Sequence, residues 1–155
     1  MSFELQNAKV QIMAVPQSVA TNGTITSNTL DTLGYDEVLI TLHAHGVAST
    51  ASIPGSVKIQ HADTTDATNF GNISGYTATT STSGYPTQVA ASSTTSMFAK
   101  FHLDMKGKKR YLRALIEGGG SGGTTCLQSV VAILGRADAA PSGTNTGALF
   151  VVNPS

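Results

Sequence analysis

The chain has 155 residues, of which 12% are charged, and its nine basic and nine acidic residues give a formal net charge of zero. That length suits one domain, 1–155, with a single core. Zero net charge excludes long-range attraction to nucleic acid or to a membrane surface. Low charge combined with 40% apolar residues is typical of a surface that neighbouring molecules cover.

Export and cross-linking signals are missing from the sequence. The single cysteine, Cys126, excludes a disulfide framework or a cysteine-based zinc site within one chain. The opening "MSFELQNAKV" lacks the positive start and apolar run of a signal peptide. No stretch approaches the roughly 18 apolar residues of a membrane span. We therefore expect synthesis in a cytoplasm and no contact with a membrane.

Alternating apolar and polar residues recur along the chain and predict strands. In "EVLITLHAHG", Val38, Ile40, Leu42 and Ala44 share one face, and Leu39, Thr41, His43 and His45 share the other. Similar alternation marks 56–63, 96–105 and 109–117. "CLQSVVAILGR" is apolar on both faces, which is typical of a central strand covered on both sides.

Turn signals separate these strands. Asn22-Gly23 predicts a hairpin between "SVAT" and "TITS", and "DTLGYD" predicts a turn with a glycine that takes positive φ. Gly107 in "KGKK" predicts a hairpin between "FHLDM" and "RYLRALI", and "EGGGSGGTT" predicts one that joins the last two strands. Residues 74–96, with 13 Ser or Thr among 23, predict a long loop that is functional or ordered by a partner.

Seven to nine strands with no convincing helix predict an all-β fold. A single β-sandwich of the jelly-roll type fits this pattern best, with the long Ser/Thr-rich loop and extended termini. We expect a flexible N-terminal arm over 1–9 and a C-terminal tail over 139–155. The tail contains "ALFVV", and this apolar patch predicts docking onto its own sheet or onto another subunit.

His43 and His45 are the strongest candidates for metal chemistry, because alternate residues of a strand leave the same face. His61 or His102 would have to supply a third ligand. Jelly-roll metalloenzymes of the cupin type place a glutamate soon after such a pair, but the next one here is Glu117. Polar residues on a solvent or subunit face are the simpler interpretation, and we expect no metal and no cofactor.

No pattern of nucleophilic catalysis is present either. The chain has no Gly-x-Ser-x-Gly elbow. Asp63 and Asp66 in "HADTTDATN" lack the spacing and terminal glutamate of a calcium loop, so we expect them to hydrogen-bond their own backbone. We expect a protein that is not an enzyme.

Basic residues gather in "MKGKKR", which brings Lys106, Lys108, Lys109 and Arg110 together. Nucleic-acid binders add stacking aromatics and a broader basic face, so we expect no nucleic acid as partner. Two interpretations stay open: a basic surface that meets an acidic protein, and a solvated tip that keeps the strands soluble. With Leu149 and Phe150 of the tail, these four residues are the candidate partner-binding residues.

The chain resembles small virion proteins of tailed bacteriophages, of the head decoration (cement) type. The resemblance is carried by "FELQNAKV", "LDTLGYDEVLITLHAHG", "SVKIQHADTTDATNFGNISG", "FHLDMKGKKRYLRALIEGGG" and "SVVAILGRAD". It rests on the texture of strands and turns and carries no catalytic residue. It implies a structural protein that stabilises the capsid exterior by bridging capsomers.

The resemblance implies several further expectations. The partners would be the major capsid protein and further copies of this chain, in a homo-oligomer that is a trimer rather than a dimer. The protein would be made in the cytoplasm of a bacterial host and reside on the capsid surface of the virion. The alternatives are a carbohydrate-binding or tail-associated β-sandwich module and, behind it, a cupin-like metalloenzyme.

Overall fold

The computed structural model describes residues 8–19, 23–46, 54–79, 96–118 and 126–137. Strands dominate this part of the chain, and its one helical turn is the 3-10 helix η2, Ala67–Asn69. The strands are β1 (Lys9–Val19), β2 (Thr24–Thr26), β3 (Leu30–Asp31), β4 (Tyr35–Gly46), β5 (Pro54–Ala62), β6 (Gly71–Thr79), β7 (Ser96–Asp104), β8 (Tyr111–Gly118) and β9 (Cys126–Ala137).

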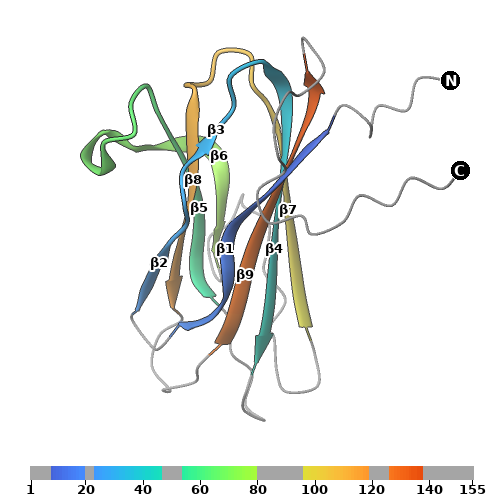
Figure 1. Cartoon of the computed structure of the whole chain (residues 1–155). Coiled ribbons are helices and arrows are strands. Elements are labelled where there is room, and N and C mark those ends of the chain that lie inside the picture. Colours follow the sequence, from blue (N-terminus) through green and yellow to red (C-terminus); the bar gives the residue numbers. More distant parts are fainter. Residues whose placement is uncertain (1–7, 20–22, 47–53, 80–95, 119–125, 138–155) are drawn as a thin grey trace, which may run out of the picture.

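The strands form two sheets that lie face to face (Figure 1). One sheet has the order β1-β9-β4-β7 and the other has β2-β8-β5-β6, with β3 also paired to β8. Because β2 and β3 share this partner, they act as two halves of one interrupted edge strand. If β2 and β3 are counted as one strand and the strands are renumbered from one to eight along the chain, one sheet has the order one, eight, three, six. The other sheet has the order two, seven, four, five. This is the order of a jelly roll, and it confirms the predicted fold class.

The core lies between the sheets and follows the alternation in the sequence. Val38, Ile40, Leu42 and Ala44 of β4 are buried as predicted, whereas His43 and His45 are exposed. Other strands of both sheets supply buried residues of the same kind, among them Ile59, Leu103, Leu112, Ile116, Val130 and Leu134. Each fully buried side chain of this size contributes about 1.5–3 kcal/mol to folding.

The three predicted hairpins are wrong, although the strands on either side of each turn exist. β1 and β2, β7 and β8, and β8 and β9 are successive strands, but the members of each pair lie in different sheets. Each connection therefore crosses from one sheet to the other. Among successive described strands, β5 and β6 do pair with each other. Periodicity predicts a strand but not its partner, because a jelly roll pairs strands that are far apart in sequence.

The turn glycines adopt the backbone conformation that the sequence predicts. Gly34 has φ 81° and Gly107 has φ 73°, a left-handed region that favours glycine. The long loop was predicted to begin too early, because β6 runs to Thr79 and pairs with β5. The remainder of that loop, residues 80–95, lies outside the described residues, as do 1–7 and 138–155 with Leu149 and Phe150.

Strand β9 is central in its sheet, between β1 and β4, as the sequence predicts. Its inner residues Val130, Ala132 and Leu134 are buried. The expected second cover is not provided by the described part of the chain, because Val131 and Ile133 on the outer side are only half-buried. A two-layer sandwich covers just one face of each sheet.

The strand ends divide between the two ends of the sandwich. At the loop end, the residues that flank the internal undescribed segments are paired in register: Val19 with Cys126, Gly46 with Cys126, His45 with Ser96, Pro54 with Gly118, and Ser56 with Thr79. The turn end carries the turns at 32–34, 63–70 and 105–110 (Figure 1). The residues that flank the undescribed segment 80–95, Thr79 and Ser96, and the basic turn therefore lie at opposite ends of the sandwich.

The break between β2 and β3 joins the two sheets. Ser27 is buried, and its Oγ accepts a hydrogen bond of 2.8 Å from the backbone N–H of Ala114 in β8. The next N–H, that of Asn28, donates over 2.8 Å to the carbonyl of Met13. Met13 lies in β1 of the other sheet, at a register shift between Ile12 and Ala14. The bulge thus turns a carbonyl toward the opposite sheet, where the broken strand supplies a donor.

Replacing Ser27 by alanine should destabilise the fold by about 1–3 kcal/mol, because the buried N–H of Ala114 loses its acceptor. Equilibrium unfolding in urea measures the difference. Ser74→Ala on β6, where the side chain is exposed, is the matched control and should change stability by less than about 0.5 kcal/mol. Equal effects of the two substitutions would contradict this role of Ser27.

Candidate interaction surface

The turn end carries a mixed cluster of charges. It contains four of the predicted partner-binding residues, Lys106, Lys108, Lys109 and Arg110, and the structure brings them together on one turn. Acidic residues come to the same end from neighbouring turns and strand ends: Asp31, Asp36, Glu37, Asp63, Asp66 and Asp104. The basic turn therefore lies among carboxylates.

Lys109 is held through both its side chain and its backbone. Its Nζ lies 2.9 Å from Asp63 Oδ2, and its backbone N–H donates to His61 Nδ1 over 3.3 Å. Burial, followed by the charges of Lys109 and Lys108, lowers the pKa of His61 below its ordinary value. A lowered pKa keeps the ring neutral, as an acceptor must be.

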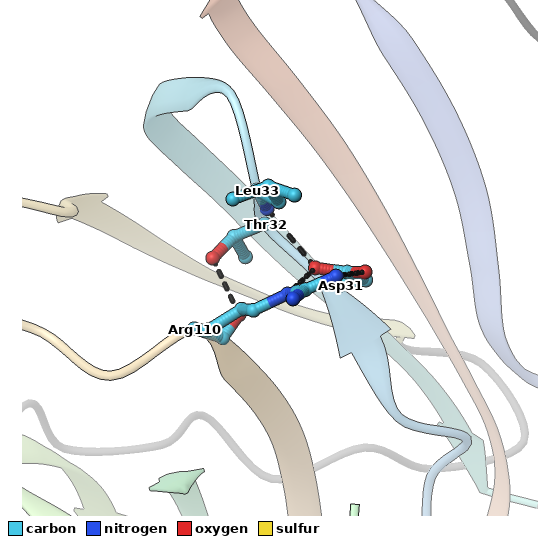
Figure 2. Close-up of polar contacts among 4 residues, drawn as sticks. All are labelled: Asp31, Thr32, Leu33 and Arg110. Atoms are coloured by element: carbon cyan, nitrogen blue, oxygen red, sulfur yellow. Dashed lines mark hydrogen bonds and ion pairs between the residues drawn. The ribbon is translucent and has the colours of Figure 1, made fainter. Parts of the chain in front are cut away.

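Arg110 is also engaged within the chain (Figure 2). Its Nε donates to Asp31 Oδ1 over 2.8 Å and its Nη2 to Oδ2 over 2.7 Å. The same Oδ1 accepts from Leu33 N over 3.1 Å, and Thr32 Oγ1 donates to the carbonyl of Arg110 over 2.6 Å. The bidentate pair clamps the turn after β3 onto the start of β8.

The hydrogen bond from Arg110 is the main reason that the pKa of Asp31 lies below its ordinary value of 3.8; burial, the next influence, raises the pKa, and the hydrogen bond from Leu33 lowers it. A depressed folded-state pKa stabilises the fold above the unfolded-state value. That contribution is lost as the pH falls through the folded-state pKa. Because both side chains are 43% exposed, solvent screening keeps the contribution small.

Asp31→Asn keeps an acceptor for the N–H of Leu33 and removes the charge. We expect the variant to be less stable than the wild type at neutral pH. The difference should shrink and vanish as the pH falls below 3.8, because the wild-type carboxylate then becomes protonated too. Urea unfolding of both proteins over this pH range measures it. A difference that is independent of pH would refute the assignment.

Lys106 and Lys108 are the cations left for a partner, since neither ammonium makes an ion pair within the described chain. Lys106 borders a hollow of about 440 Å³ that is also lined by Tyr35, Asp36, Glu37, Asp104 and Met105. The contact with an acidic protein stays a prediction, and the structure narrows the candidate contact residues to these two lysines.

The turn at Asp66 is as predicted, because its Oδ1 accepts from Thr68 N over 2.9 Å.

A second surface, which the sequence did not single out as a site, lies on the outer face of sheet β1-β9-β4-β7. Strand register places Val10, Ile133 and Leu39 in one row across the sheet, and Ile12 and Val131 in the next. We call these five half-buried residues the outer stripe. Phe98 and Leu127, 57% and 41% exposed, extend the apolar surface toward the loop end. The doubly apolar pattern of "CLQSVVAILGR" was the signal for it.

The outer face of the other sheet is polar and internally satisfied. Arg113 Nε donates to Gln60 Oε1 over 2.7 Å, and Gln60 Nε2 donates to Asn72 Oδ1 over 2.8 Å. The guanidinium of Arg113 also lies 4.2 Å from the ring centre of Phe70. Lys58 pairs with Glu117 over 2.7 Å farther along. The apolar surface therefore belongs to one side of the sandwich.

The histidine pair lies on the outer face, next to this apolar surface. The rings of His43 and Phe98 meet edge to face, with centres 4.9 Å apart. They border a shallow pocket of about 280 Å³ together with Pro16, His45, Leu127 and Ser129. His61 comes from the other sheet, and His102 pairs with Leu39, four residues from His43. In the described part of the chain, no three potential metal ligands come together.

No protein-family model and no curated protein matches the chain. Solved structures do match its fold. The VP2 subviral particle of infectious bursal disease virus aligns with a TM-score of 0.51 and 11% identity, over 84% of this chain and 32% of that one. The chain thus spans about a third of the length of VP2. This likeness shows a shared fold.

Weaker matches come from other proteins. The K3 adhesin domain of Lys-gingipain from Porphyromonas gingivalis aligns with a TM-score of 0.44 and 14% identity, over 77% of this chain and 74% of that one. The SPBc2 prophage-derived protein YomS aligns with a TM-score of 0.37 and 13% identity, over 83% of this chain and 93% of that one.

In the described residues, no helix is long and apolar enough to cross a membrane.

Proposed function

We propose that the chain is a structural virion protein of a tailed bacteriophage that binds the exterior of the capsid and bridges neighbouring capsomers. Its partners would be the major capsid protein and further copies of itself, and it would act without a cofactor and without catalysis. The jelly-roll fold of the chain, which aligns with the viral protein VP2 at a TM-score of 0.51, is the observation that carries the proposal.

The distribution of charge supports the same role. At the turn end, Lys109 and Arg110 are neutralised by Asp63 and Asp31, and charges of both signs are mixed on this surface. Such a surface exerts little long-range attraction, so binding depends on shape and on short-range contacts. A protein that occupies fixed positions on a shell needs contacts of this kind.

The first test offers emptied capsids and free DNA to the full chain side by side. We expect co-sedimentation with the shells and none with DNA. Lys106→Glu combined with Lys108→Glu should weaken shell binding and leave the melting temperature nearly unchanged, because exposed charges contribute under about 1 kcal/mol each. Ser74→Glu, at an exposed position of β6 in the other sheet, is the control. Binding to DNA but not to shells would defeat the proposal.

The second test concerns the C-terminal tail with Leu149 and Phe150. Because β9 ends at Ala137, removing residues 140–155 should leave the cooperative unfolding transition in place. It should weaken assembly on the shell if the tail supplies a contact. Replacing only Leu149 and Phe150 by serine separates the apolar segment from the length of the tail. Unfolding of the truncated chain in isolation would instead assign the tail to the core.

A carbohydrate-binding or tail-associated module is the second candidate, and one observation favours it. Phe98, 57% exposed, stands beside His43, His45 and Ser129 around the pocket. An exposed ring beside hydrogen-bonding side chains suits the apolar face and hydroxyl groups of a sugar. Binding of soluble glycans with no binding to shells would favour this candidate over decoration.

A further inference from the structure

Strand β9 is apolar on both sides, and the fold buries one of these sides in the core. Val130, Ala132 and Leu134 are buried between the sheets. Val131 and Ile133 point the other way and continue into Val10 and Ile12 of β1 and Leu39 of β4. This outer stripe contains no charged residue, and the charges of that face lie on and beside edge strand β7.

We propose that the outer stripe packs face to face against the outer stripe of a second copy of this chain. The two copies are related by a two-fold axis that lies between their two outer faces and runs perpendicular to the strands. This pairing would be the contact through which copies of the chain associate, and it rests on the self-association stated under the proposed function. The pairing is two-fold, whereas the resemblance to decoration proteins implied a trimer.

The size of the face fits a second sheet. Four strands spaced about 4.8 Å apart, with twelve-residue strands β4 and β9 rising about 3.3 Å per residue, cover roughly 19 Å by 40 Å, or about 760 Å². A stable interface buries about 800 Å² on each partner. Sheets of this kind stack about 10 Å apart with their strands nearly aligned. An apolar centre with a polar rim is also the usual arrangement of such an interface.

Charge complementarity selects the arrangement. His102, Leu39, Ile133 and Val10 form one row across the four strands. Lys100 lies two residues from this row on one side, and Asp104 lies two residues from it on the other. A half-turn about the row exchanges the two sides. Each copy's Lys100 then faces Asp104 of the other, so two ion pairs flank the apolar contact.

Lys100 and Asp104 are free to make this contact. Both are exposed, and neither side chain forms an ion pair within the described residues. Asp104 Oδ1 accepts from the N–H of Lys106 over 2.9 Å, which orients the carboxylate and leaves its charge for a partner. A half-turn about an axis along the strands would instead place β7 over β1, where no carboxylate of β1 awaits Lys100.

The test is sedimentation equilibrium of the full chain over a series of concentrations. The wild type should show a monomer–dimer equilibrium. Lys100→Asp places acids opposite Asp104, and Asp104→Lys places lysines opposite Lys100. Each variant alone should weaken dimerisation about tenfold or more, because like charges then meet twice. An equimolar mixture should recover dimers, since each mixed pair regains both attractions.

Two controls separate this contact from damage to the fold. Asp104→Asn keeps the acceptor for the N–H of Lys106, so its melting temperature reports on the turn while its dimerisation reports on the charge. Val131→Asp on the outer stripe should abolish dimerisation, whereas Leu115→Asp, half-buried on the outer face of the other sheet, should not. Melting curves establish that each variant is folded.

A wild type that stays monomeric at every concentration, or that sediments as a trimer, overturns the pairing. A mixture of the two charge variants that dimerises no better than either alone overturns the two-fold arrangement. A monomeric wild type that still binds shells would remove this pairing and leave the decoration proposal standing. An intact dimer that does not bind shells would do the reverse.

Discussion

A two-layer sandwich can bury only one face of each sheet, and the arrangement of this molecule follows from that constraint. Strand β4 obeys it with apolar residues inside and histidines outside, apart from Leu39 on its outer side. Strand β8 obeys it with Leu112, Ala114 and Ile116 inside. Strand β9 does not, because its outer side is apolar as well. The excess is shared with β1 and β4 and forms one continuous surface, which is why we place self-association there.

The outer faces of the two sheets differ in the side chains that they expose to solvent. On the sheet that contains β8, polar side chains bond to one another, as in the chain from Asn72 through Gln60 to Arg113. On the sheet that contains β9, the five apolar side chains of the outer stripe stand half-buried instead. A satisfied polar network gains little from a partner, whereas an apolar surface gains from every contact that removes it from water.

The turn end shows how neighbouring turns change the meaning of a basic cluster. Read along the chain, Lys106 to Arg110 form a block of positive charge. In the fold, Asp63 comes from the turn after β5 and Asp31 from β3, and they pair with Lys109 and Arg110. The positive block becomes a mixed surface in which Lys106 and Lys108 keep their charges available. The clustering of the basic residues was predictable from the sequence, but the acidic partners of Lys109 and Arg110 were not.

The sequence by itself determined which segments are strands, which side of β4 is buried, and which glycines turn the chain, because these properties depend on period-2 alternation and on local backbone sterics. The tertiary structure alone decided which strands pair. Hairpins expected at Asn22-Gly23 and around Gly107 became crossings between sheets, since strand pairing in a jelly roll joins residues that can be more than a hundred positions apart, as in β1 and β9. The outer stripe follows the same rule: its members come from β1, β4 and β9, and only the register of three distant strands sets them side by side.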